Sequence, residues 1–175
     1  MRTCAWIWVL CLCYPLAYAQ TSPGAAVAQS DAIKSNTAAS PSLLEHAFFD
    51  IIRGGDTAEF LSYVPQDGVN LGRDAQHTSR SDIEEQFTHR TGLYCRLFDS
   101  ACLRRSGSSD PLACSYRELL TQSDKVRTAS TETTRNGVRQ AILVAEVHNQ
   151  KCAGPVLIDF IFNYQQGGWK LFSIP

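Results

Sequence analysis

The sequence lacks an excess of charge of either sign. Its 175 residues contain 16 Lys and Arg against 17 Asp and Glu, which gives a formal net charge of −1. A nucleic-acid-binding domain needs a basic surface, so the balance excludes that class. The chain is 44% hydrophobic, which excludes a disordered polypeptide, and it has no internal repeat, which excludes a collagen-like chain. Its length favours one folded domain over a multidomain enzyme.

The sequence also lacks the motifs of metal and thiol chemistry. It has no C-x-x-C pair, and Cys95, Cys102 and Cys114 are separated by six and eleven residues, too far for a zinc knuckle. The four histidines are scattered without an H-E-x-x-H pattern: His46, His77, His89 and His148. We therefore expect no metal site and no cofactor.

Residues 1–19 have the pattern of a secretory signal peptide. Arg2 supplies a positive charge, and residues 5–16 form an apolar run too short to cross a bilayer as a helix. Ala17-Tyr18-Ala19 presents the small residues that signal peptidase accepts, which predicts cleavage between Ala19 and Gln20. The alternative is an uncleaved N-terminal anchor. We expect a secreted or periplasmic protein with no stable membrane span after cleavage.

Removal of this segment changes the number of cysteines from odd to even. Three of the seven cysteines lie within residues 1–19, which leaves Cys95, Cys102, Cys114 and Cys152. An even number in an exported chain predicts two disulfides, for which three pairings exist. We favour Cys95 with Cys102, because this bond closes a short loop. We also favour Cys114 with Cys152, because this bond ties the segment 93–115 to the connection between two of the predicted strands, 138–150 and 156–164.

Residues 20–41 are rich in Ala, Ser, Thr and Gln and predict a flexible linker, so the folded domain is expected over 42–175. Within it, four polar residues are each followed three positions later by Glu, the pattern of a helix start. These pairs are Ser42 with Glu45, Asp56 with Glu59, Ser81 with Glu84, and Ser115 with Glu118. The sequence therefore predicts three to four helices, the last over 116–122.

From Val126 onward the hydrophobic period changes to that of strands. Two segments, 126–135 and 138–150, flank Asn136-Gly137, a dipeptide suited to a two-residue hairpin turn. Two more, 156–164 and 169–174, are joined by a second tight turn. We expect an α+β fold in which the helices pack on a curved antiparallel sheet that ends in a four-stranded meander.

Pairing of Gln150 with Pro155 would give this meander two different faces. The face expected to pack against the helices carries Ala141, Leu143, Ala145, Val147, Ile158, Phe160, Phe162, Tyr164, Trp169 and Leu171. The opposite face carries Ile142, Val144, Glu146, His148, Asp159, Ile161, Asn163, Lys170, Phe172 and Ile174. The second face is half apolar, so we expect it to meet another protein surface, most simply that of a homodimer.

Several short stretches resemble the cystatin-like α+β roll of the nuclear-transport-factor-two-like and SnoaL-like families. They are Gly55-Asp56, Ala58 with Leu61, Asp67 with Val69, residues 81–87 (SDIEEQF), and residues 168–174 (GWKLFSI). The resemblance implies helices packed on a curved antiparallel sheet. These families include isomerases, dehydratases and cyclases as well as binding domains, so the resemblance implies the fold and not a reaction. The cysteine-containing insertion at 93–115, with its polar loop at 106–110, departs from the family pattern.

One charged group on the second sheet face is a candidate for acid and base chemistry. In the proposed register Arg127 and Asp159 both lie opposite Glu146, and His148 lies two residues along the strand. Adjacent carboxylates raise one pKa, which is how a general acid or base is made. The alternative is a solvated ladder of charged side chains. Three tyrosines could lie at the rim of a pocket between helices and sheet: Tyr63, Tyr94 and Tyr164.

The sequence thus predicts an exported, non-catalytic binding module of the cell envelope that takes a small apolar ligand or an envelope protein. It predicts no nucleic-acid partner. One alternative is a SnoaL-like acid and base enzyme of the isomerase, dehydratase or cyclase type, acting on an apolar substrate. A second alternative is an inhibitor or accessory of an envelope enzyme that uses the segment 95–114 as its contact surface.

Overall fold

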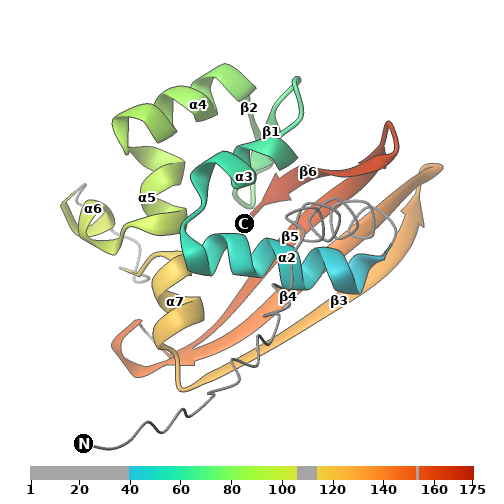
Figure 1. Cartoon of the computed structure of the whole chain (residues 1–175). Helices are drawn as coiled ribbons and strands as arrows, with labels where there is room; N and C mark the ends of the chain where they lie inside the picture. The colour runs from blue at the N-terminus through green and yellow to red at the C-terminus, as the bar shows by residue number, and fades with distance from the viewer. Residues whose placement is uncertain (1–39, 106–113, 153) are drawn as a thin grey trace, which may run out of the picture.

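The computed structural model describes residues 40–105, 114–152 and 154–175. The predicted signal peptide, the linker up to residue 39 and the polar loop at 106–110 lie outside the described residues. The fold is α+β, with helices packed on one face of a six-stranded sheet (Figure 1). The sheet order is β2-β1-β6-β5-β4-β3.

The first two described helices are α2 (Pro41–Gly54) and α3 (Thr57–Tyr63). The start of α2 is two residues before the predicted one, because Ser40 is the N-cap and Pro41 occupies the first turn, where its fixed φ suits a helix. Gly55 ends α2 with φ +75°, a left-handed conformation that glycine adopts readily. The predicted cap of α3 is confirmed, since Asp56 accepts a hydrogen bond from the Glu59 N–H at 3.0 Å.

Helix α4 (Arg80–His89) also begins two residues before the predicted start. Its cap is Ser79, whose Oγ accepts from the Asp82 N–H at 3.2 Å, so the predicted cap at Ser81 is wrong. Helix α7 (Tyr116–Gln122) has the predicted bounds, and Ser115 caps it by accepting from the Glu118 N–H.

The insertion contains two helices that the sequence did not predict, α5 (Gly92–Phe98) and α6 (Ser100–Arg105). The described residues therefore contain six helices rather than three to four. Both are too short to show a helical hydrophobic period. The start of α5 is held by a tertiary contact, because the Leu93 N–H donates to Oε1 of Gln86 at 2.7 Å while the cap residue Thr91 makes no side-chain bond.

The four predicted strands are present as β3 (Lys125–Arg135), β4 (Val138–Asn149), β5 (Gly154–Gln165) and β6 (Gly168–Ile174). The Asn136-Gly137 turn is confirmed, with φ of +53° and +78°. A small hairpin, β1 (Val69–Leu71) and β2 (Gln76–Thr78), extends the sheet. The predicted four-stranded meander is antiparallel, but the whole sheet is mixed, because β1 pairs parallel to β6.

The register between β4 and β5 differs from the predicted one by two positions. Asn149 pairs with Gly154, and His148, rather than Gln150, pairs with Pro155. The Asn149 side chain accepts from the Lys151 N–H at 2.9 Å and starts the turn at Asn149. Gly154 then adopts φ +89°, which a larger residue would resist. A shift of two leaves each side chain on its predicted face.

One residue lies on the opposite face from its prediction. Ile174 is fully buried, although the alternation predicted it for the outer face. The pairing of β5 with β6 shifts between Ile161 and Phe162, so that Phe162 is opposite Leu171 while Ile161 is opposite Ser173. Such a bulge adds one residue to one strand and reverses the alternation beyond it.

The helices α2, α3 and α7 and the helix-facing side of the sheet share one hydrophobic core. Figure 1 shows α2 lying across the long strands, where Leu44, Phe48 and Ile52 are fully buried. Among the described residues, no helix has the length and apolar composition needed to cross a membrane.

Candidate functional site

Aromatic side chains fill the space between the helices and the sheet. The Phe48 ring lies 4.9 Å from the Phe160 ring and 4.8 Å from the Phe162 ring, measured between centroids. All three side chains are fully buried, and Trp169 is 3% exposed. Rings at these distances are in contact. Packed side chains therefore occupy this part of the fold.

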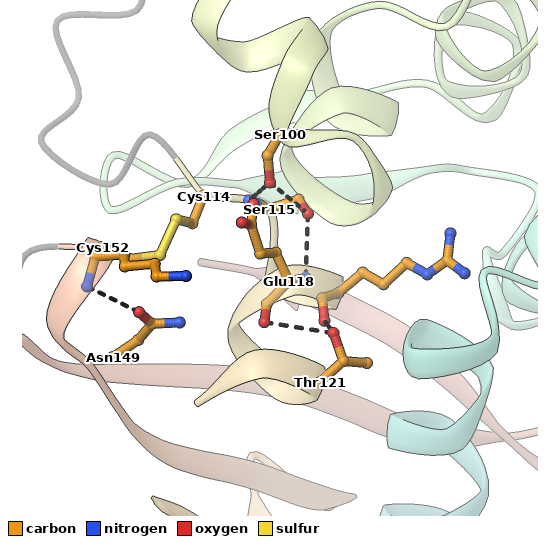
Figure 2. Close-up of a disulfide and its surroundings, with 9 residues drawn as sticks. Ser100, Cys114, Ser115, Glu118, Thr121, Asn149 and Cys152 are labelled. Carbon is orange, nitrogen blue, oxygen red and sulfur yellow. Dashed lines mark hydrogen bonds between the residues drawn. A yellow bond between two sulfur atoms is a disulfide. The ribbon is translucent and has the colours of Figure 1, made fainter. Parts of the chain in front are cut away.

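The insertion is fastened to the sheet by a disulfide. Figure 2 shows Cys114, directly before α7, bonded to Cys152 in the turn between β4 and β5. Beside it, Ser100 of α6 accepts from the Ser115 N–H at 2.7 Å and donates its hydroxyl to Ser115 Oγ at 3.0 Å. These contacts fix the ends of α6 and α7 to each other and to the sheet.

A second disulfide, between Cys95 and Cys102, joins α5 to α6. The structure thus contains the pairing that the sequence favoured. All four cysteines of the described residues are used in these two bonds. Within the same residues, no three His, Cys, Asp or Glu side chains are grouped so that they could hold a metal ion.

An open groove of about 630 Å³ lies where the insertion meets the sheet. The groove is formed by the β1–β2 turn, helices α5, α6 and α7, the start of β5 and the end of β6. We call it the insert groove, and its lining residues are Gly72, Arg73, Arg96, Leu103, Cys114, Tyr116, Val156, Leu157, Asp159, Ser173 and Pro175.

Two donors converge on one main-chain oxygen in the insert groove. Arg96 Nη1 donates to the Pro175 carbonyl oxygen at 3.1 Å, and the Tyr116 hydroxyl donates to the same oxygen at 3.0 Å. Arg73 is exposed, and it forms no ion pair or side-chain hydrogen bond with residues 40–105, 114–152 or 154–175. The groove therefore combines a bound main-chain carbonyl with an unpaired guanidinium.

The charged residues predicted for acid and base chemistry lie on the outer sheet face. Arg127 is opposite Glu146, as predicted, and both line a second groove of about 390 Å³ together with His148. Asp159, however, is opposite Val144, so its predicted pairing with Glu146 is wrong. The turn that begins at Asn149 is the cause, since it displaces β5 by two residues along β4. The two carboxylates are diagonal neighbours rather than direct cross-strand partners.

The three tyrosines predicted for a pocket rim have different surroundings. Their ring partners, with centroid distances, are Phe48 for Tyr63 (5.6 Å), Phe98 for Tyr94 (5.7 Å) and Trp169 for Tyr164 (5.1 Å). Tyr164 also lies under the Arg139 guanidinium, 4.7 Å from its ring centroid. Arg139 in turn donates to Glu132 at 2.7 Å, and this hydrogen bond lowers the pKa of the Glu132 carboxyl.

No protein-family model, curated protein or solved structure matches this chain. What the protein does must therefore be inferred from its own residues and their arrangement.

Sequence reasoning named Cys114 and Asp159, which line the insert groove, but it missed the two arginines and the tyrosine that meet there. Arg73 and Arg96 are 23 positions apart, and Tyr116 and Leu157 come from still later elements. No local motif joins them. The available signal was the cysteine pattern, because the favoured pairing ties the insertion to the β4–β5 turn and so places it beside the start of β5.

The outer sheet face exposes two large apolar side chains, Leu157 at 65% and Phe172 at 40%. On this face β4 carries Ile142, Val144, Glu146 and His148, so the face is half apolar, as the sequence indicated. A homodimer through this face stays a prediction.

The buried hydroxyl of Tyr63 makes the stability of the folded protein depend on pH in the alkaline range. Burial, and to a smaller extent the charge of Glu59, raises the pKa of Tyr63 above its ordinary value of 10.0. Stability from the neutral hydroxyl is therefore fully present below pH 10 and is lost as pH rises through the folded-state pKa. We expect Tyr63→Phe to raise the midpoint of alkaline unfolding, followed by circular dichroism. Glu59→Gln should shift it less in the same direction, and a lower midpoint for Tyr63→Phe would contradict the assignment.

Proposed function

We propose that the protein is an exported, non-catalytic binding domain that holds its partner in the insert groove. The observation that carries this proposal is that the open space lies on the insertion and not between the helices and the sheet. Aromatic rings fill the space between helices and sheet, whereas a groove of about 630 Å³ lies outside it, on the insertion. A partner can therefore dock on the insertion without entering the interior.

The anchoring of the insertion supports a docking role. Binding to a flexible loop is weakened by the entropy lost when the loop becomes ordered. Here one disulfide joins α5 to α6 and the other joins the start of α7 to the β4–β5 turn. The groove walls are thus held before a partner arrives. This arrangement fits an accessory or inhibitor of an envelope enzyme that uses the segment 95–114 as its contact surface.

Export is part of the proposal. Two disulfides are compatible with an oxidising, extracytoplasmic compartment. The pattern of residues 1–19 supports a signal peptide cleaved between Ala19 and Gln20, and we propose a secreted or periplasmic location on these two grounds.

The proposal is tested by site-specific crosslinking in the cells that make the protein. A photoreactive amino acid replaces Leu157, which is 65% exposed in the insert groove, or Val138, which is 38% exposed at the distant hairpin tip. We expect illumination to yield one crosslinked species of defined mass from position 157 and none from position 138.

Two results would overturn this proposal. Equal adducts from both positions would indicate contact without a defined site. A single adduct with twice the mass of the chain would show that Leu157 contacts a second copy, which favours the homodimer through the outer sheet face instead.

A further inference from the structure

We infer that the insert groove takes an extended polypeptide segment with a carboxylate side chain at its centre and apolar side chains two positions to either side. This inference rests on the proposed function, because it names the partner chemistry of the same groove.

The insert groove continues into a neighbouring groove of about 460 Å³. The two share five lining residues: Gly72, Arg73, Arg96, Leu103 and Pro175. One arm runs from this shared centre toward the start of β5, and the other runs toward the junction of α4 with α5, where Gln86 and Gly92 line it. A continuous open path of this kind fits an extended chain better than a compact small molecule, which binds in an enclosed pocket.

The centre of this path is positively charged. Arg73 and Arg96 both line the shared part, and Arg73 has no partner among the described residues. One carboxylate lines each arm, Asp159 toward β5 and Asp74 toward the junction of α4 with α5, whereas the five shared lining residues include no Asp or Glu. Guanidinium groups pair with carboxylates through two parallel hydrogen bonds. A carboxylate is therefore the side chain that this centre would bind.

Each arm offers an apolar wall. Leu157 is exposed in the arm toward β5, and Leu71, which is half-buried, lines the other. Leu157 is the most exposed large hydrophobic residue of the described chain. In an extended peptide, side chains two positions apart point to the same side. A central carboxylate in the groove would thus bring the side chains two positions before and after it against these walls.

The groove already holds one oxygen of Pro175, the last residue of the sequence. Arg96 and Tyr116 both donate to the Pro175 carbonyl oxygen, at 3.1 and 3.0 Å. The Arg96 guanidinium has further N–H groups besides Nη1, so it can donate to a peptide carbonyl or to a side-chain carboxylate. A polypeptide supplies both kinds of oxygen, whereas a simple anion supplies only one.

The test is fluorescence anisotropy with the oxidised protein and a labelled seven-residue peptide with blocked termini. The peptide has glutamate at position four, leucine at positions two and six, and serine elsewhere, and its matched control has glutamine at position four. We expect the glutamate peptide to bind about tenfold more tightly. Arg73→Gln should remove that advantage and leave the glutamine peptide unaffected, while Arg135→Gln at the hairpin tip should change neither.

Three results would overturn the inference. Equal affinities for both peptides would remove the role of the carboxylate. Displacement of the glutamate peptide by inorganic triphosphate at equal concentration would indicate a general anion site. Absence of binding by either peptide would exclude this segment as the partner, and crosslinking from position 157 would then show whether the proposed docking function survives without it.

Discussion

Replacing Phe48 with alanine is expected to lower the free energy of unfolding by about 4 kcal/mol. Phe48 is fully buried, and its ring contacts Phe160 and Phe162 on the sheet and Phe60 on α3. Removal of the ring loses the free energy of transferring it from water to the core. It also leaves a cavity in which the surrounding rings lose contacts, because a packed core relaxes only partly. The measurement is urea unfolding followed by circular dichroism.

The matched control is Phe172→Ala on the outer face. Phe172 is 40% exposed, so its replacement should change stability by about 0.5 kcal/mol or less. Benzene gives a second readout, because it can bind in the apolar cavity that removal of an aromatic ring leaves. Saturating benzene should raise the melting temperature of Phe48→Ala and leave that of the wild type unchanged. Stabilisation of the wild type would reveal an interior cavity and would favour the enzyme alternative.

Removing the disulfide between Cys114 and Cys152 is expected to destabilise the protein by about 4 kcal/mol. The bond spans 38 residues, and the loop entropy that it removes from the unfolded chain grows with that length. The bond between Cys95 and Cys102 spans 7 residues, for which the same relation gives about 2 kcal/mol. Denaturant unfolding of the two double serine variants compares them directly.

The two disulfides should also differ in their effect on docking. Without the Cys114–Cys152 bond the insertion loses its covalent tie to the sheet, so crosslinking from position 157 should fall sharply. Loss of the Cys95–Cys102 bond leaves that tie in place and should reduce crosslinking less. Equal destabilisation by both double variants would contradict the loop-entropy argument, and unchanged crosslinking in both would contradict the role of the insertion as a docking surface.

The acid and base alternative has lost its main geometric support. It depended on Asp159 lying opposite Glu146, and the structure places Val144 there. Arg127, Glu146 and His148 still line one groove on the outer face, which is consistent with the solvated charged ladder considered from the sequence. A catalytic role for this group would require a substrate bound on an open sheet face.

Local patterns predicted the elements well where their signals lie within a few residues. The Asn136-Gly137 turn, the caps at Asp56 and Ser115 and the four long strands depend on neighbouring residues alone, and the structure contains all of them. The misplaced helix starts have a local cause as well. Ser40 lies two positions before the predicted cap of α2, and Pro41 directly after it suits the first helical turn. Ser79 lies two positions before the predicted cap of α4 and accepts a hydrogen bond from the Asp82 N–H.

The sequence by itself determined the α+β class and the two-faced sheet, because hydrophobic period and turn chemistry act over short distances. It left three cysteine pairings open, and the structure contains the favoured one. Only the tertiary structure decided the β4–β5 register, the filled interior and the insert groove. These depend on side chains from distant segments meeting in space, as when Arg73, Arg96 and Tyr116 come together around the end of β6. No residue in that group carries information about the others until the packing of the helices on the sheet brings them into contact.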